Sequence, residues 1–198
     1  MASQTPYAQL TGTWKFWVAT ASTAIPDIDA APSGSWTEIG ATDGDQTLQW
    51  LGALVAFSDN ETTGPRKHVR PEEGFTVAAS LVDLTLEKWA RVLSMASSDV
   101  TTTTSGGESV KKMPLKRGFI PTRYALLARG GAIVSANTLS PYGAWPSQLW
   151  IPQGVFDGEP SQAYGKSNRP MVPFLFRAEV DSSQSAGEEF GYLMVQSS

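Results

Sequence analysis

Hydrophobic and polar residues alternate along several stretches of the chain, and this two-residue period is typical of β-strands with one buried face. Every second position of residues 171–181 is apolar in the most regular case, at Val172, Phe174, Phe176, Ala178 and Val180. Strands are also predicted over residues 13–18, 46–57, 75–82, 119–128, 148–156 and 189–196. A turn is predicted at Asp43–Gly44, just before the second of these strands.

The period changes within residues 74–93, from that of a strand to that of a helix. Thr85 can cap the start of the helix, and Glu87 suits its positively polarised end. We therefore predict a single helix over residues 85–96, packed onto the outer side of a sheet. Its apolar stripe has the three- and four-residue spacing of one helix face and consists of Leu86, Trp89, Ala90, Leu93 and Ala96.

Between these elements the chain is rich in loop-forming residues. Residues 21–34 are rich in Pro, Ala and Asp, and residues 58–73 form a long polar link. Residues 97–112 form a Thr, Ser and Gly tract that we interpret as a mobile loop. The two strands around the polar link resemble an extended hairpin. Together, these predicted elements indicate a mainly β fold, a β-sandwich or β-barrel of about seven strands with one flanking α-helix. We predict a single domain over residues 1–198, with an N-terminal arm at about 1–12 and a C-terminal strand or arm at about 182–198.

The amino-acid composition argues against several classes of function. The 198 residues carry 15 basic and 19 acidic side chains, so no basic surplus favours non-specific binding of nucleic acid. Cysteine is absent, which excludes disulfides, a thiol nucleophile and a cysteine-bound metal. No apolar run approaches the ~20 residues of a membrane-spanning helix, and residues 1–10 lack the basic and apolar regions of a signal peptide.

Catalytic chemistry has little support in the sequence. The single histidine, His68, stands in the polar link, where a solvated loop residue is the ordinary interpretation. Carboxylate pairs such as Glu188 and Glu189 occur in predicted turns and loops rather than across a recognisable cleft. We therefore expect no enzymatic activity, no catalytic residue, no metal site and no cofactor.

Two features leave binding functions open. Basic residues cluster in two predicted loops, but aromatic residues for base stacking are not interleaved with them; the clusters are Arg66, Lys67, His68 and Arg70, and Lys111, Lys112, Lys116 and Arg117. The seven tryptophans could form a sugar-stacking platform, as in carbohydrate-binding modules. Several occupy apolar positions of predicted elements, however, which favours the core or a subunit interface; these are Trp14, Trp50, Trp89 and Trp150.

The order of the features resembles that of one protein family. An early strand and a Pro/Ala-rich loop precede "WTEIGATDGDQTLQW", a long polar link leads to "RPEEGFTVAASLVDLTLEKWARVL", and "LWIPQGVFDGEP" and "RPMVPFLFRAEVD" follow. Over most of residues 13–181, this pattern is similar to the major tail proteins, or tail tube proteins, of long-tailed bacteriophages. The resemblance rests on pattern and element order, since that family has no catalytic signature.

The resemblance implies a structural role in the virion. Family members are β-sandwiches or barrels with one helix; six subunits close a ring, and stacked rings form a β-lined tube through which genome DNA passes without specific binding. The implied partners are other copies of the chain and the tail terminator, tape measure and distal tail proteins, with no membrane. A related tail-terminator or secretion-tube component is the alternative within this class, and a carbohydrate-binding module is the alternative outside it.

This interpretation assigns expected roles to two groups of residues. The 58–73 link is too long and too mixed in charge for a simple turn, so we expect subunit or ring contacts from Arg66, Lys67, His68, Arg70, Glu72 and Glu73. A bore that lets DNA slide should repel phosphate, and the candidate lumen acids are Asp43, Asp45, Glu179 and Asp181. The predicted strand 46–57 is rather apolar for a wet wall, and the sequence leaves its register open.

Overall fold

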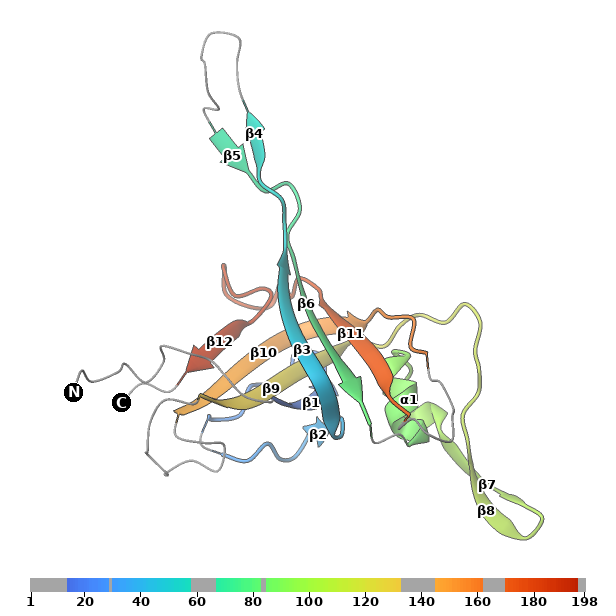
Figure 1. The fold of residues 1–198 in the computed structure, drawn as a ribbon. Helices are drawn as coiled ribbons and strands as arrows, with labels where there is room; N and C mark the ends of the chain where they lie inside the picture. The colour runs from blue at the N-terminus through green and yellow to red at the C-terminus, as the bar shows by residue number, and fades with distance from the viewer. Residues whose placement is uncertain are drawn as a thin grey trace.

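A computed structural model describes residues 14–28, 30–57, 67–82, 85–132, 145–161 and 170–195. It confirms the mainly β fold with one α-helix (Figure 1). The main sheet has eight strands; seven follow the antiparallel order β2-β1-β9-β10-β11-β6-β3, and β12 pairs with β10. These strands are β1 (Lys15–Thr20), β2 (Thr37–Glu38), β3 (Thr42–Leu51), β6 (Gly74–Leu81), β9 (Tyr124–Ala132), β10 (Trp145–Phe156), β11 (Val172–Ala178) and β12 (Tyr192–Val195).

The sheet curls until its two ends approach each other, as in an incompletely closed barrel. The side chain of Gln46 on β3 makes the connection, because it hydrogen-bonds the backbone of Trp14, just before β1. The Trp14 N–H donates to Gln46 Oε1 at 2.7 Å, and Gln46 Nε2 donates to the Trp14 carbonyl at 2.8 Å. One side-chain amide thus makes the pair of bonds that a neighbouring strand would otherwise make.

The main core fills the inside of this curl. The inward residues of β1, β6, β9, β10 and β11 form one buried cluster, and a chain of edge-to-face aromatic contacts runs through it. Phe174 lies 5.6 Å from Phe16 and 5.7 Å from Phe156, measured between ring centroids, and Phe156 lies 5.1 Å from Phe176. Within β11 the period-two pattern predicts the buried face correctly, since Val172, Phe174, Phe176 and Ala178 are all buried. Val180, which lies beyond the strand, is 58% exposed, so the pattern is wrong there.

A second, smaller core lies on the opposite face of β1, β9 and β10. Trp17, Leu127 and Trp150 from the strands pack there with Trp36, and Ile25 packs against them. The described residues of the Pro- and Ala-rich segment after β1 form no strand or helix until β2, as predicted, but the segment is packed on the sheet. It covers three strands, and the indole N–H groups of Trp36 and Trp150 donate to the carbonyls of Ala24 and Thr23.

A buried arginine fastens this covering segment. Arg129 on β9 is 1% exposed, and its guanidinium donates to the side-chain oxygen of Gln148 and to backbone carbonyls of Pro26, Asp27 and Ala30. Charged donors make stronger hydrogen bonds than neutral ones, and each orphaned buried acceptor is costly. The Arg129 side chain therefore links two strands of the sheet to the segment that covers them.

The helix α1 (Leu86–Val92) begins where the sequence predicted and ends earlier. The Thr85 hydroxyl accepts from the Lys88 N–H, which confirms the cap. After Leu93 the chain turns sharply, because Ser94 adopts a left-handed φ of 53° and the N–H groups of Ser94 and Met95 return to carbonyls of the last turn. This closure, typical of a Schellman motif, ends the helix well before the predicted residue 96.

The helix packs against the main core, on the concave side of the curled sheet, and its place on the outer side of an assembled tube stays a prediction. Trp89 is partly buried against the main core cluster, which also includes Val92, a residue missing from the predicted stripe. Ala90 is buried, whereas Leu86 and Leu93 are half-buried. The turn after the helix is held by Ser94, whose hydroxyl bonds both the N–H and the carbonyl of Phe156. The helix therefore helps to close the open curl, and the segment after β1 covers the outer face.

Several element limits differ from the predictions for local reasons. Asp43–Gly44 is not a hairpin turn but lies within β3, at an irregularity where pairing with β6 jumps from Asp43 to Thr47. The predicted strand 46–57 breaks at Gly52, whose φ is 152°. The strand predicted over 119–128 begins only at Tyr124.

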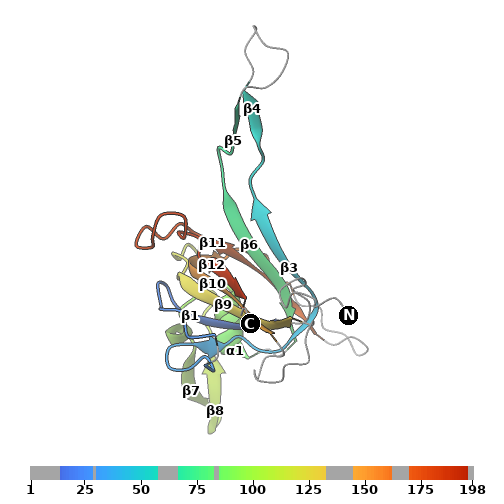
Figure 2. The same ribbon diagram turned by 90° about the vertical axis from the view of Figure 1, so that its left-hand side faces the viewer.

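The predicted extended hairpin is present. Strands β3 and β6 continue beyond Gly52 into a second, two-stranded sheet of β4 (Val55–Phe57) and β5 (Lys67–Val69), which projects from the body in both views (Figures 1 and 2). We call β4, β5 and the described residues 53, 54 and 70 that join them to the body the arm. Its tip, residues 58–66, lies outside the described residues.

The Thr, Ser and Gly tract was predicted to be a loop, and this is wrong. It forms a two-stranded hairpin of β7 (Thr101–Ser105) and β8 (Glu108–Lys112), which points away from the arm (Figure 2). Gly106 and Gly107 form its turn with φ values of 61° and 85°, which suit a tight hairpin. Lys111 Nζ lies 2.5 Å from Glu87 Oε1 on α1, and this hydrogen bond lowers the pKa of Glu87 to about 2.

Candidate interaction surface

The most unusual surface of the molecule is the edge strand β3. It ends the strand order, so none of the strands that the structure describes pairs with the other side of its backbone. All of its residues are exposed except the half-buried Thr42, Gln46 and Leu51. Two large apolar side chains on it, Leu48 and Trp50, are 41% and 49% exposed. Long exposed edges with apolar side chains favour pairing with another chain.

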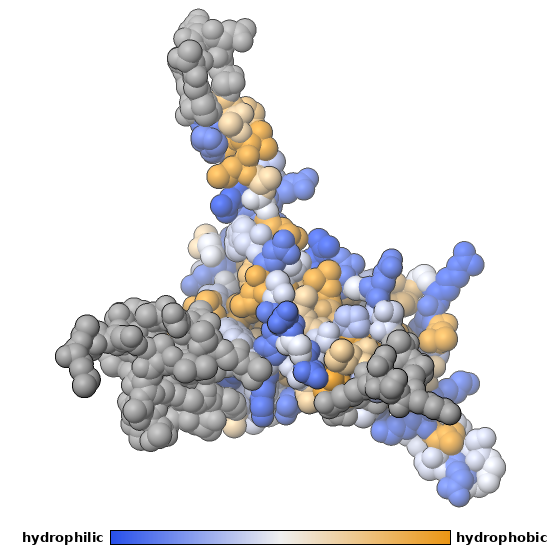
Figure 3. Space-filling view, viewed as in Figure 1, coloured by the Kyte–Doolittle hydropathy of each residue, from blue (hydrophilic) through white to orange (hydrophobic). Residues whose placement is uncertain are grey.

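The arm extends this apolar surface away from the body. Leu54, Val55 and Phe57 are exposed on it, and Figure 3 shows apolar residues gathered along the arm below its grey tip. A two-stranded sheet has no core of its own and is marginal in water. The exposed apolar residues of the arm are therefore candidates for a contact with another chain.

The predicted contact residues divide between the arm and its base. Lys67 and His68 lie on β5, and Arg70, Glu72 and Glu73 lie between β5 and β6, all of them exposed. Arg66 falls outside the described residues. The structure thus gathers five of the six predicted residues in one projecting region, as their closeness in the sequence requires.

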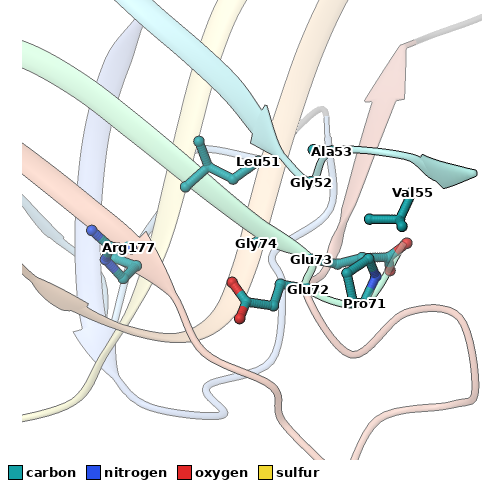
Figure 4. A pocket seen from close by; sticks show the side chains of 9 residues that line it. All are labelled: Leu51, Gly52, Ala53, Val55, Pro71, Glu72, Glu73, Gly74 and Arg177. Atoms are coloured by element: carbon teal, nitrogen blue, oxygen red, sulfur yellow. The ribbon is translucent and has the colours of Figure 1, made fainter. Parts of the chain in front are cut away.

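A shallow pocket of about 280 Å³ lies where the arm joins the body (Figure 4). Its apolar wall includes Leu51, Val55 and Pro71, while Glu72 and Glu73 contribute carboxylates and Arg177 of β11 stands at one side. Gly52 permits the bend here, because a side chain at this position would meet the Glu72 carbonyl at 3.0 Å and the backbone is in a conformation that favours glycine. We call this the arm-base pocket.

The register of β3 resolves which of its residues share a face. Leu48 pairs with Val77 and Trp50 with Phe75, so both lie on the core side. Trp50 also meets Phe190 edge-to-face at 6.0 Å. The opposite face of β3, β6 and β11 presents mostly short or uncharged polar side chains in cross-strand rows. We call it the polar face; its central members are Thr47, Gln49, Thr76, Ala78, Ser80, Leu175 and Arg177, of which Thr76 is only 5% exposed.

The predicted lumen acids occupy different environments. Asp43 and Asp45 are exposed on β3. Glu179 follows β11 and is bonded to Arg123 at 2.6 Å. Asp181 is only 5% exposed, and its carboxylate accepts hydrogen bonds from Ser22 and Ser183. Its assignment as a lumen acid is therefore wrong, because a carboxylate used this way serves the fold.

The hydrogen bonds to Asp181 should make the folding stability depend on pH. Hydrogen bonds from the Ser183 and Ser22 hydroxyls lower the pKa of Asp181 to about 2, below the ~3.9 of a free aspartate. Because the folded state holds the proton less tightly than the unfolded state, the stabilisation is present above about pH 4 and is lost as the pH falls towards about 2. Urea unfolding of the wild type should lose more stability over this interval than Asp181→Asn does.

The exposed Asp45→Asn is the matched control and should follow the wild type. Equal losses for the wild type and Asp181→Asn between pH 4 and pH 2 would contradict the role given to this carboxylate.

Other kinds of site receive no support from the described residues. No three His, Asp or Glu side chains in the described ranges lie close enough to hold a metal ion. His68 is exposed on the arm. Where the structure describes the chain, no helix is long and apolar enough to cross a membrane. The tryptophans other than Trp50 whose side chains are described are buried or partly buried, so they do not form an open platform.

Comparison with known proteins does not indicate a function for this chain, so the exposed surface of β3 and the arm is the main evidence. No protein-family model matches the chain, and no curated protein is significantly similar to it. The apolar character of residues 46–57 is evident from the sequence, whereas the exposure of Leu48 and Trp50 is not. Two features of the sequence are nevertheless consistent with this exposure. The predicted strand has more apolar residues than a strand with one solvent-exposed face needs, and it is interrupted by Gly52.

Proposed function

We propose that this chain is the structural subunit of a phage tail tube, assembled as six-membered rings that stack into a hollow conduit for DNA. The observation that carries the proposal is the ten-residue edge strand β3, exposed over most of its length, with apolar side chains that continue along the arm. A surface of this kind needs another chain to cover it. The family resemblance in element order points to further copies of the same chain.

The polar face suits the wall of the conduit. In the proposed ring it faces inward, and the β3 edge of each copy joins the sheet of the next, so the lining is continuous. Short uncharged residues such as Thr47, Ala78 and Ser80 carry no positive charge that would bind a DNA phosphate. The one cation in its central rows, Arg177, is paired with Asp157 at 2.7 Å. Exposed Asp43 and Asp45 add negative charge at the β3 end, which repels DNA.

Heterologous contacts explain why one chain suffices. When one patch on a copy binds a different patch on the next, the copies form closed rings or open filaments rather than dimers. The edge strand and arm supply one such patch on this chain. No catalytic group is needed for the proposed role, and virion location and the other tail proteins as partners belong to the same proposal.

Sedimentation velocity over a wide range of protein and salt concentration tests the proposal. We expect the protein to pass from small species to rings and long polymers as its concentration rises, because the contact repeats along the assembly. A strict monomer under every condition would overturn the proposal.

A further inference from the structure

The loop between β8 and β9 exposes apolar side chains without an obvious structural reason. Leu115 is 87% exposed and Ile120 is 91% exposed, and Lys116 and Arg117 stand between them. Single exposed apolar residues are ordinary, but two almost fully exposed aliphatic residues on one short loop form a distinct surface. We call residues 113–121 the basic loop.

The basic loop is held in place rather than free. The Thr122 N–H donates to the Ser94 carbonyl at 2.7 Å, and Lys116 Nζ bonds Asp99 at 2.6 Å. Pro114 and Pro121 restrict the backbone near its two ends. A loop fixed in this way presents its apolar residues at a small entropic cost on binding.

The arm-base pocket has the complementary properties. It is smaller than the roughly 300–1,000 Å³ of typical small-molecule sites, and its wall is apolar, so it suits one or two aliphatic side chains. The carboxylates of Glu72 and Glu73 outweigh the nearby Arg70, since Arg177 is already paired with Asp157. An apolar segment with a positive charge is therefore the kind of partner that the pocket fits.

We propose that the basic loop of one copy docks into the arm-base pocket of the next copy. Ile120, the more exposed of the two aliphatic residues, enters the apolar wall, and Arg117 faces Glu72 and Glu73. No residue of the loop lines the pocket in the same copy, and the anchors at Ser94 and Asp99 hold the loop in its place. The contact is heterologous, so it propagates from copy to copy. The inference rests on the proposed tube function and specifies which surfaces meet.

The absence of cysteine allows a direct test by disulfide trapping. An Ile120→Cys protein is mixed with a Val55→Cys protein and oxidised mildly; each copy has one thiol, so a mixed dimer reports a contact between copies. We expect this mixed dimer to form at least about ten times faster than that from Leu193→Cys and Val55→Cys. Equal or slower trapping of the Ile120 pair would overturn the inference.

Exchange of charges between the loop and the pocket provides a second test. Arg117→Glu and Glu73→Arg should each raise the concentration for half-assembly by at least about tenfold, and the double variant should recover most of this loss. Lys112→Glu, also exposed and next to the loop, should assemble as the wild type does. If the wild type assembles and Arg117→Glu assembles equally well, the docking inference fails while the tube proposal stands. A wild type that never assembles defeats the tube proposal itself.

Discussion

A double replacement of Leu48 and Trp50 by lysine is expected to leave the protein folded and to abolish its assembly. Both side chains are nearly half exposed in the single copy, so the fold loses mainly the two ring contacts of Trp50, with Phe75 and Phe190, together about 1–3 kcal/mol. In the proposed tube they are buried at every contact between neighbours, where two unpaired charges are strongly unfavourable. The concentration for half-assembly should rise at least about 100-fold, measured by sedimentation.

The control uses apolar residues that are equally exposed but lie away from β3. Val180→Lys and Leu193→Lys change charge and hydropathy in the same way and should assemble as the wild type does. Circular dichroism melting of each variant separates assembly from folding. If the Leu48 and Trp50 variant assembles at wild-type concentrations, β3 is not an interface and the proposed joining of sheets is wrong.

Arg129→Met is expected to cause a large loss of folding stability, about 3–5 kcal/mol, because it removes several hydrogen bonds from a charged donor. The buried guanidinium donates to Gln148 and to three backbone carbonyls of the covering segment. Methionine fills part of the volume but leaves these acceptors buried without this donor. Urea unfolding should show the loss as a lower midpoint with little change in slope.

Arg123→Met is the matched comparison. Arg123 bonds Glu179 at the surface, with 60% of its side chain exposed, and exposed ion pairs contribute roughly 0–1 kcal/mol. We expect its unfolding midpoint to stay close to that of the wild type. If the two variants lose similar amounts of stability, Arg129 does not fasten the covering segment.

The predictable part of the fold is the part that depends on local pattern. Alternation along β11 identified its buried face, and the polar link between two apolar runs identified the extended hairpin. Thr85 indicated the start of the helix. The end of the helix was not predictable from its stripe, because Ser94 adopts a left-handed conformation that is supported by the distant Phe156. Tertiary contacts, absent from any local pattern, decided that boundary.

The sequence indicates parts of the candidate surface only where residues that are close in the sequence are also close in the structure. The charged residues on β5 and just after it lie together because they are neighbours in the sequence, and their role in contacts stays a prediction. Asp181 was misassigned, since its serine partners include Ser22, far away in the chain. Phe119 and Ile120 suggested a strand because they are apolar, yet both are exposed. Apolar character alone does not distinguish a residue buried in its own fold from one that is available to a partner.

Electron microscopy of the purified protein at increasing concentration tests the central claim most directly. The account predicts rings of six copies and tubes of uniform width, with the polar face of β3, β6 and β11 around the bore and β3 of each copy against the next. Featureless single copies at every concentration and salt condition would contradict the tube. Tubes with a bore lined by Lys111, Lys112, Lys116 and Arg117 would contradict the proposed lining.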